Sequence, residues 1–233
     1  MREPINVSGM VLSASPVGEY DKRVVILTRE LGKITAFARG ARRMKSPLMA
    51  VSNPFVFGEF QVYEGRDSYT LSGANIKEYF LDLAQMQPGV YYGFYFLELA
   101  EYFGQEGNDE TQMLNLLYVT MNAIRSGKQD LRLIRCIFEL RTITISGEAP
   151  QMFSCMECGT KENLTVFSLR DSAIYCPNCG KTIRDPWPLQ PGTVLACRYI
   201  IAAPLAKLYG FTVNEERLNE LEIGGWIIPE SFA

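Results

Sequence analysis

The chain has 233 residues, of which 47% are apolar and 21% are charged, and its formal net charge is −3. This composition is typical of a folded globular protein and excludes a disordered or collagen-like chain, and the length suits two packed units. The start of the chain lacks the basic end and apolar run of a secretory signal, and the most apolar stretches, 90–99 and 194–205, are interrupted by charged residues or proline. We therefore expect a cytoplasmic protein without a membrane span, in a compartment where thiols stay reduced.

Charge is distributed unevenly along the chain. Residues 1–80 hold 11 Lys or Arg against 8 Asp or Glu, whereas residues 81–233 hold 12 against 18. No carboxylate occurs between Glu30 and Glu59, and that gap contains five cations: Lys33, Arg39, Arg42, Arg43 and Lys45. A patch of this kind can bind a polyanion, and a solvated loop that only keeps the protein soluble is the alternative.

The first third of the chain predicts short β-strands. Five segments rich in β-branched or aromatic residues are bounded by turn-forming residues, and they cover residues 7–14, 23–28, 33–40, 59–65 and 68–74. Five such strands favour a small barrel. In the third segment, alternation predicts an inner face of small apolar residues, namely Ile34, Ala36 and Ala38. The same alternation predicts an outer face with Lys33, Thr35, Phe37 and Arg39.

From residue 76 the hydrophobic period changes to that of amphipathic helices. Four helices are predicted, over residues 76–85, 90–104, 109–127 and 131–143. Asn108 or Asp109 is the candidate N-cap of the third helix, Gly127 ends it, and Asp130 is the candidate N-cap of the fourth.

Four of the six cysteines form two C-x2-C pairs, CMECG at 155–159 and CPNCG at 176–180. Their spacing is that of a four-thiolate zinc site, in which each pair binds from a tight turn and the chain between them folds as a hairpin. The segments LTVFSL and SAIYC predict the two strands of that hairpin. A set of buried or redox-active thiols is the alternative. Cys136 and Cys197 stand alone in apolar helical contexts and are interpreted as small buried hydrophobes.

A complete shell of four cysteines leaves no open coordination position, so the predicted Zn2+ is structural. Residues 153–186 carry four cations and four carboxylates, and four thiolates with one Zn2+ add a charge of about −2, which disfavours phosphate binding by this segment. The chain has no histidine, which excludes His-based triads, Cys-His dyads and H-E-x-x-H sites. The tripeptide 180–182 lacks the first glycine of a phosphate-binding loop, since residue 175 is Tyr. The sequence therefore favours binding over catalysis.

Three segments of the chain together form a distinctive set of motifs. They are GEYDKRVVILTRELGKITAFARGARRMKSPL, the aromatic strand FVFGEFQVYEG, and FELRTITISGEAP with the two C-x2-C pairs that follow it. The specific parts are T-x-x-x-G-K-x-x-x-x-A-R-G-A-R-R at residues 28–43 and the four-cysteine insert. With these segments the chain resembles the RecO family of bacterial recombination mediators, and the resemblance runs over most of the chain.

The resemblance implies an α+β multidomain protein. We expect an OB-fold barrel at 1–78, an α-helical domain from 79–150 and 187–233, and a zinc module at 151–186. The implied DNA-binding cations are Lys33, Arg39, Arg42, Arg43 and Lys45. The implied ligands of one structural Zn2+ are Cys155, Cys158, Cys176 and Cys179.

The resemblance also implies a function without catalysis. Members bind single- and double-stranded DNA, anneal complementary strands and act with RecR to help load RecA onto DNA coated with single-stranded-DNA-binding protein. Such a protein would be cytoplasmic and associated with the nucleoid during repair.

The basic cluster suggests how DNA would be held. Arginines on the rim of a small barrel neutralise phosphates and release counterions without reading sequence, and an outward Phe37 would give bases a stacking surface. Packing within the barrel is the alternative for Phe37, because OB barrels also bury aromatic residues where a strand bends. A second class of function stays open, a zinc-stabilised protein–protein adaptor with only incidental DNA binding.

Overall fold

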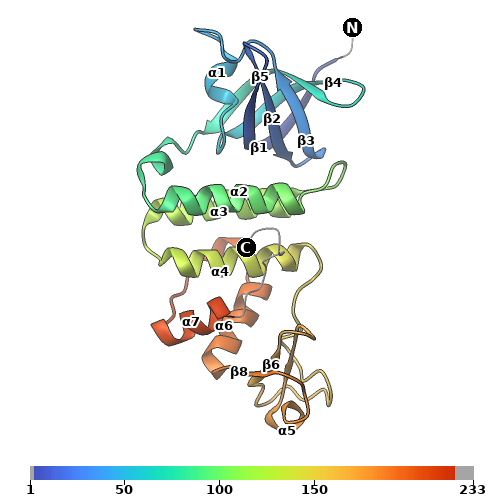
Figure 1. Ribbon diagram of the computed structural model, residues 1–233, viewed down its shortest axis with the longest axis vertical. Coiled ribbons are helices and arrows are strands. Elements are labelled where there is room, and N and C mark those ends of the chain that lie inside the picture. The colour runs from blue at the N-terminus through green and yellow to red at the C-terminus, as the bar shows by residue number, and fades with distance from the viewer. Residues whose placement is uncertain (1–2, 224–233) are drawn as a thin grey trace. The chain divides into compact units, whose positions relative to one another are not determined.

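Five strands form the N-terminal barrel of the computed structural model, which describes residues 3–223 (Figure 1). In chain order they are β1 (Ile5–Val17), β2 (Asp21–Thr28), β3 (Gly32–Ala38), β4 (Phe57–Glu64) and β5 (Tyr69–Glu78). Their order around the barrel is β1-β2-β3-β5-β4, with β4 pairing back onto β1. The contact between β3 and β5 is parallel and the other pairs are antiparallel. A short helix, α1 (Leu48–Val51), follows β3, and the whole is an OB-like barrel.

The interior of the barrel is apolar. Ile26 and Phe60 have no exposed surface, and Ile34, Ala36 and Ala38 of β3 are buried while the residues between them are half-buried. The alternation predicted for this strand is therefore confirmed. Burial of these side chains fixes which face of β3 points outward, because a shift of one residue would turn every side chain over.

The helix predicted over residues 76–85 is wrong. Ile76 and Glu78 continue β5, where they pair with Gly58 and Phe57 of β4, and Ile76 packs against the barrel core. Only the second half of the segment is helical, as a single 3-10 turn, η1 (Leu81–Gln85). Strand pairing and burial override the local helical period here.

Two long helices complete this part of the chain. The helices α2 (Gly89–Phe103) and α3 (Thr111–Ser126) confirm the predicted second and third helices. A carboxylate oxygen of Asp109 accepts a hydrogen bond from the backbone N–H of Thr111 at 2.9 Å, and Gly127 after the helix has a φ of +61°. These are the starting and ending signals that the sequence predicted.

The rest of the chain combines helices with a small sheet. The helix α4 (Leu131–Ile145) begins at Asp130, whose side chain accepts a hydrogen bond from the backbone N–H of Arg132, as predicted. The sheet has the order β7-β6-β8, from β6 (Val166–Ser168), β7 (Ala173–Tyr175) and β8 (Pro186–Pro188). The remaining elements are α5 (Pro177–Gly180), α6 (Pro191–Ala202), η2 (Leu205–Lys207) and α7 (Glu215–Ile223).

An ion-pair network joins α7 to α4. Arg132 contacts the carboxylates of Glu222 at 2.5 Å and Glu215 at 2.7 Å, and Arg135 contacts Glu222 at 2.8 Å. The hydrogen bond from Arg132 lowers the pKa of Glu222, with burial acting in the opposite direction. The carboxylate therefore stays ionised and holds the last described helix against α4.

The predicted fold class, an OB-like barrel followed by helices and a four-cysteine segment, is confirmed. The chain divides into two compact units, one up to Arg125 and one from Ser126. The helix α2 therefore belongs to the unit that contains the barrel, and α4 belongs to the unit that contains the cysteines. Among residues 3–223, no helix is long and apolar enough to cross a membrane.

Candidate nucleic-acid interface and metal centre

Most of the predicted basic cluster lies on the loop that leaves β3. Four of its cations are exposed to solvent, and they are Arg39, Arg42, Arg43 and Lys45. Ala41 between them is fully buried, and the backbone N–H of Gly40 donates a hydrogen bond of 2.7 Å to the carboxylate of Asp21. The loop is thus anchored at its backbone, and its charged side chains are left outside. We call the segment 39–45 the basic loop.

The turn between β1 and β2 supports the two central arginines. The backbone N–H of Arg42 donates to the carbonyl of Tyr20 at 2.8 Å, and its guanidinium donates to the carbonyl of Gly18 at 3.2 Å. The guanidinium of Arg43 lies 4.9 Å from the centre of the Tyr20 ring. A cation held over an aromatic face is attracted by the ring quadrupole, so Tyr20 helps to position Arg43. Sequence reasoning missed Tyr20, because its place beside the loop depends on strand pairing.

The basic loop carries uncompensated positive charge. Among the residues that the structure describes, none of the ion pairs includes Arg39, Arg42, Arg43 or Lys45. The pKa of neighbouring Lys22 is lowered, first by burial and then by the charge of Arg42. The positive charge of Arg42 thus disfavours the positive charge of Lys22. A site with such repulsion between cations favours the binding of an anion.

Phe37 lies beside this loop on the outer face of β3. Its side chain is half-buried, and its strand partners are Arg23 of β2 and Thr70 of β5. Residues directly opposite in an antiparallel pair share a face, so Arg23 stands next to Phe37 on the outer surface of the barrel. Arg23 is exposed and its guanidinium donates a 3.4 Å hydrogen bond to the hydroxyl of Thr35. The sequence analysis did not select Arg23, because only the register of β2 against β3 places it there.

Lys33 lies apart from the other predicted cations. It occupies the opposite end of β3 from Arg39, about 20 Å away at ~3.3 Å per residue. Its ammonium donates a hydrogen bond of 2.5 Å to the backbone carbonyl of Glu101, near the end of α2. Carbonyls in the last turn of a helix lack partners within the helix, so Lys33 satisfies one of them. The structure does not bring Lys33 together with the basic loop.

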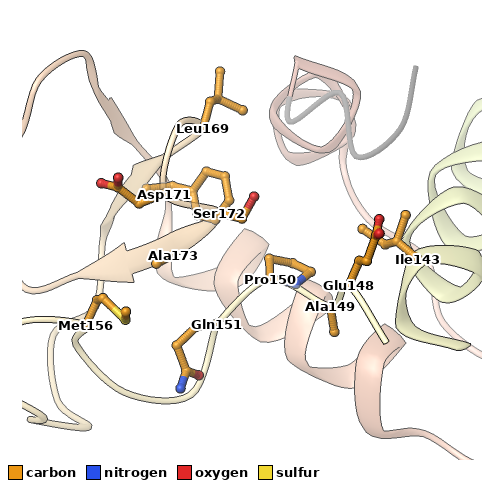
Figure 2. Close-up of a pocket in the computed structure, with 11 residues that line it drawn as sticks. Ile143, Glu148, Ala149, Pro150, Gln151, Met156, Leu169, Asp171, Ser172 and Ala173 are labelled. Atoms are coloured by element: carbon orange, nitrogen blue, oxygen red, sulfur yellow. The ribbon is translucent and has the colours of Figure 1, made fainter. Parts of the chain in front are cut away.

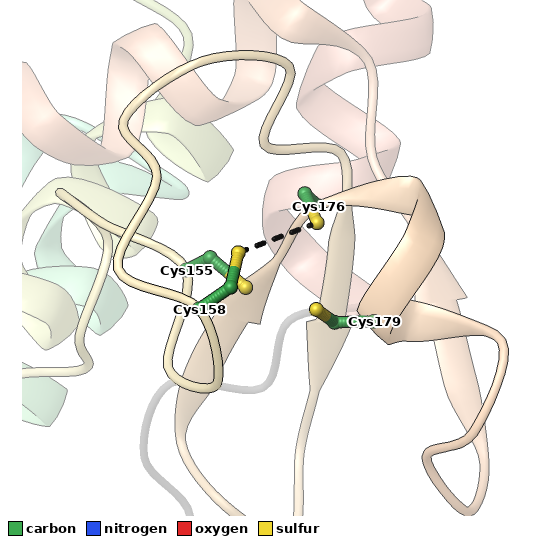
Figure 3. A group of neighbouring side chains, drawn as sticks. All are labelled: Cys155, Cys158, Cys176 and Cys179. Atoms are coloured by element: carbon green, nitrogen blue, oxygen red, sulfur yellow. Dashed lines mark hydrogen bonds between the residues drawn. The ribbon is translucent and has the colours of Figure 1, made fainter.

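The four predicted metal ligands converge on one point (Figure 3). The sulfur atoms of Cys155, Cys158, Cys176 and Cys179 all lie within 4.8 Å of one another. The sulfurs of Cys158 and Cys176 are 3.9 Å apart. A tetrahedral ion with metal–sulfur bonds of about 2.3 Å would hold its sulfurs about 3.8 Å apart, so the cluster has the size to bind one metal ion.

Tight turns and a hairpin create this convergence. The backbone N–H of Gly159 donates to the carbonyl of Cys155 at 2.9 Å, and that of Gly180 donates to the carbonyl of Cys176 at 2.8 Å. The strands β6 and β7 pair antiparallel between the two turns, as predicted, and bring the second pair of cysteines back beside the first. Each turn thus supplies two ligands that are close in sequence, and the hairpin brings the two turns together.

The two glycines act for different physical reasons. Gly159 has a φ of +72°, a conformation that favours glycine, and nothing would touch a Cβ at this position. Gly180 would place a Cβ only 2.8 Å from side-chain carbons of Val166 in β6. Backbone freedom is needed at the first turn, and close packing against the hairpin is needed at the second.

Backbone amides favour negative sulfur in this cluster. Burial acts to raise the pKa of Cys155, but N–H groups of Cys158, Cys176 and Glu157 lower it to about 6. The N–H of Cys179 likewise lowers the pKa of Cys176. The hydrogen bond to Cys176 raises the pKa of the Cys179 thiol to about 12. The turns therefore stabilise the thiolates of Cys155 and Cys176, the form that binds metals, and Cys179 would have to lose its proton on metal binding.

The other two cysteines are not part of this cluster. Cys136 in α4 and Cys197 in α6 are buried, and burial raises the pKa of each thiol, which leaves both protonated. Their interpretation as small buried hydrophobes is confirmed. Each of the four clustered cysteines supplies one ligand, so a bound ion would have no open position for a substrate.

The fold and these two sites define a class of protein, an OB-like barrel with a basic loop, followed by helices and a four-cysteine cluster that could hold a metal ion. Two family models match the chain, Recombination protein O N terminal over residues 1–80 and Recombination protein O C terminal over residues 89–222. This chain belongs to the RecO family of DNA repair and recombination proteins.

Individual relatives agree with the family models. The chain is 33% identical to the DNA repair protein RecO of Alkaliphilus metalliredigens, over 93% of this chain and 90% of that protein. It is 33% identical to the RecO of Caldicellulosiruptor saccharolyticus, over 94% and 88% of the two chains. With the RecO of Bacillus subtilis the identity is 28%, over 92% and 84%.

Proposed function

We propose that this protein mediates homologous recombination by binding single- and double-stranded DNA through the outer surface of its barrel. The observation that carries the proposal is the basic loop, whose exposed cations are anchored by backbone contacts and have no carboxylate partner among residues 3–223. The proposed contact residues are Lys33, Phe37, Arg39, Arg42, Arg43 and Lys45. Arg23 and Tyr20 extend this surface.

The cations would act on the phosphate backbone. Guanidinium groups that neutralise phosphates release condensed counterions, which supplies binding energy without sequence preference. Phe37 and the neighbouring Arg23 would stack with bases through their faces. Lys33 should contribute less to DNA binding than the loop residues, because its ammonium already donates a hydrogen bond to the carbonyl of Glu101 in α2.

Annealing of complementary strands follows from this mode of binding. Contacts to the backbone screen the repulsion between two polyanions and leave the pairing edges of the bases free. The step needs no nucleotide hydrolysis. One barrel would hold one strand, so the second strand would come on a second copy of the protein.

Family membership supports the choice of partners. We infer that the protein acts with RecR and helps to load RecA onto DNA coated with single-stranded-DNA-binding protein. The four-cysteine cluster would hold one Zn2+ through Cys155, Cys158, Cys176 and Cys179, because an all-thiolate tetrahedral set is typical of structural zinc. The ion would maintain the fold of residues 151–186 and take no part in DNA contact.

Fluorescence-quench annealing of complementary oligonucleotides tests the proposal. The native protein is expected to accelerate annealing equally with and without ATP. The double variant Arg42→Ala, Arg43→Ala should lose most of the acceleration. A matched variant, Lys181→Ala with Arg184→Ala, removes two exposed cations from the cysteine module and should keep it.

A spontaneous rate at every salt and protein concentration would refute the annealing mechanism. The adaptor function would then take its place, since the basic loop would have no effect on DNA.

A further inference from the structure

A second surface of the molecule differs from the basic loop in both shape and charge. A cavity of about 560 Å³ lies within the unit from Ser126, between the end of α4 and the β6–β7 hairpin (Figure 2). This volume falls within the range of about 300–1,000 Å³ that is common for ligand pockets. The cavity is separate from the sulfur cluster, and none of the four cysteines lines it.

The cavity has a mixed lining, in which seven of the eleven residues are apolar. Ile143 and Phe167 are buried, while Met156 and Leu169 are 60% and 51% exposed. Figure 2 shows Leu169 on the β6–β7 segment and Ile143 at the end of α4, on different sides of the group of lining residues. Met156 and Leu169 therefore offer exposed apolar surface that an apolar side chain of a partner could cover.

The charged groups of the cavity are all negative. Glu148 and Asp171 line it, and no Lys or Arg does among the residues that the structure describes. One oxygen of Asp171 accepts hydrogen bonds from Ser168 at 2.8 Å and Tyr175 at 3.1 Å, which fixes the carboxylate in place. Glu148 is exposed and makes no ion pair with a described residue.

The chemistry of an occupant follows from these walls. An apolar side chain can pack against Met156 and Leu169, and a cation beside it would meet the carboxylates of Glu148 and Asp171. A nucleic acid or an acidic peptide would bring like charge to Glu148 and is disfavoured. We propose that this cavity is a docking site for a basic protein segment, one apolar side chain flanked by Lys or Arg. The inference does not depend on DNA binding by the barrel.

Peptide binding to the full-length, zinc-loaded protein tests the site. The probes are an acetylated hexapeptide with one leucine among arginines and its charge-reversed counterpart with glutamates. Affinity and the NMR shifts of the backbone amides of Ser172 and Ala173 are measured. We expect saturable binding of the arginine peptide, with shifts at these two amides, and at least ten-fold weaker binding of the glutamate peptide.

Variants separate the cavity from general electrostatic attraction. Glu148→Gln should weaken binding of the arginine peptide about three-fold, as expected for one exposed ion pair. Glu216→Gln removes an exposed carboxylate on α7, outside the cavity, and should leave the affinity unchanged. Leu169→Ser should weaken binding without altering charge. The Arg42→Ala, Arg43→Ala variant should bind the peptide as the native protein does, so failure of the DNA proposal is recognised separately.

Three results would overturn the proposal. These are equal affinity for the two peptides, equal effects of Glu148→Gln and Glu216→Gln, and shifts that avoid Ser172 and Ala173. Absence of saturable binding up to the solubility limit of the peptide would also overturn it. Single-stranded DNA that shifts the same amides would assign the cavity to nucleic acid instead.

Discussion

The basic loop of the barrel and the four-cysteine module handle charge in opposite ways. The loop exposes cations to solvent, and its backbone and the guanidiniums of Arg42 and Arg43 contact the barrel. The module gathers sulfur atoms from two turns until all four lie within 4.8 Å, and Cys155 is buried. An exposed row of cations suits an extended polyanion, and a convergent set of four sulfur ligands suits one compact cation.

This difference predicts which conditions each region responds to. Charges exposed to water are screened by salt, with a Debye length of about 10 Å at 0.1 M, so the loop should act strongly only at low or moderate salt. Metal–thiolate bonds are short and direct, and their dependence is on metal and pH. The two regions should therefore be separable by experiment.

Removal of the metal should have the largest effect. Chelation, or Cys155→Ser, is expected to unfold residues 151–186, because the bonds from one ion to the four sulfurs would no longer join the two turns. Thermal unfolding should begin at least about 10 °C lower than in the zinc-loaded protein. Metal analysis of fresh protein should give one Zn2+ per chain.

If the basic loop and the four-cysteine module act independently, DNA binding should survive loss of the metal site. The salt dependence of single-stranded DNA binding by the Cys155→Ser variant should match that of the native protein at a temperature where the barrel is folded. Less than about half an equivalent of metal in fresh protein, with four freely reactive thiols, would contradict the structural role.

A smaller loss is expected from Gly180→Ala. The new Cβ would lie 2.8 Å from Val166, and overpacking of this kind costs about 1–3 kcal/mol. Gly159→Ala meets no atom and adds only backbone strain, about 1–2 kcal/mol. Thermal unfolding of the zinc-loaded variants compares the two. Val166→Ala combined with Gly180→Ala should recover part of the loss, and a recovery of the Gly159→Ala variant by the same change would contradict this packing.

The features that sequence predicts well are those whose cause is local. The strand period of β3 and the C-x2-C turns each depend on residues a few positions apart, and both are confirmed. The stop of β5 was misjudged, because Ile76 and Glu78 are held by pairing with β4 rather than by their own propensity. Arg132 donates a hydrogen bond to Glu222, which lies 90 positions later in the sequence, and no local pattern predicts this contact.

Only some residues of the candidate DNA interface could be predicted from local sequence. The cluster from Arg39 to Lys45 is visible in the sequence because its members are adjacent. The contribution of Tyr20 and Arg23 depends on the turn and register of β2, and the separation of Lys33 depends on the length of β3. Charge content could be predicted, whereas its arrangement on the surface required the barrel.

The smallest of the expected effects concerns Tyr20. Tyr20→Leu removes the ring that lies 4.9 Å from the guanidinium of Arg43 and should weaken single-stranded DNA binding roughly two- to five-fold. The salt dependence should not change, because no phosphate contact is lost. Tyr63→Leu, at another exposed tyrosine of the barrel, is the matched control. If Tyr20→Leu and Tyr63→Leu weakened DNA binding equally, Tyr20 would have no role in positioning Arg43.

The salt dependence of single-stranded DNA binding tests the central claim most directly, the claim that the basic loop holds the DNA backbone. Binding constants of the native protein and the Arg42→Ala, Arg43→Ala variant are measured over a series of salt concentrations. The slope of log affinity against log salt should fall by about 1.4 in the variant, at about 0.7 per lost phosphate contact, and should stay unchanged for Lys181→Ala with Arg184→Ala. An unchanged slope in the Arg42→Ala, Arg43→Ala variant, or an equal fall in the control, would contradict the account.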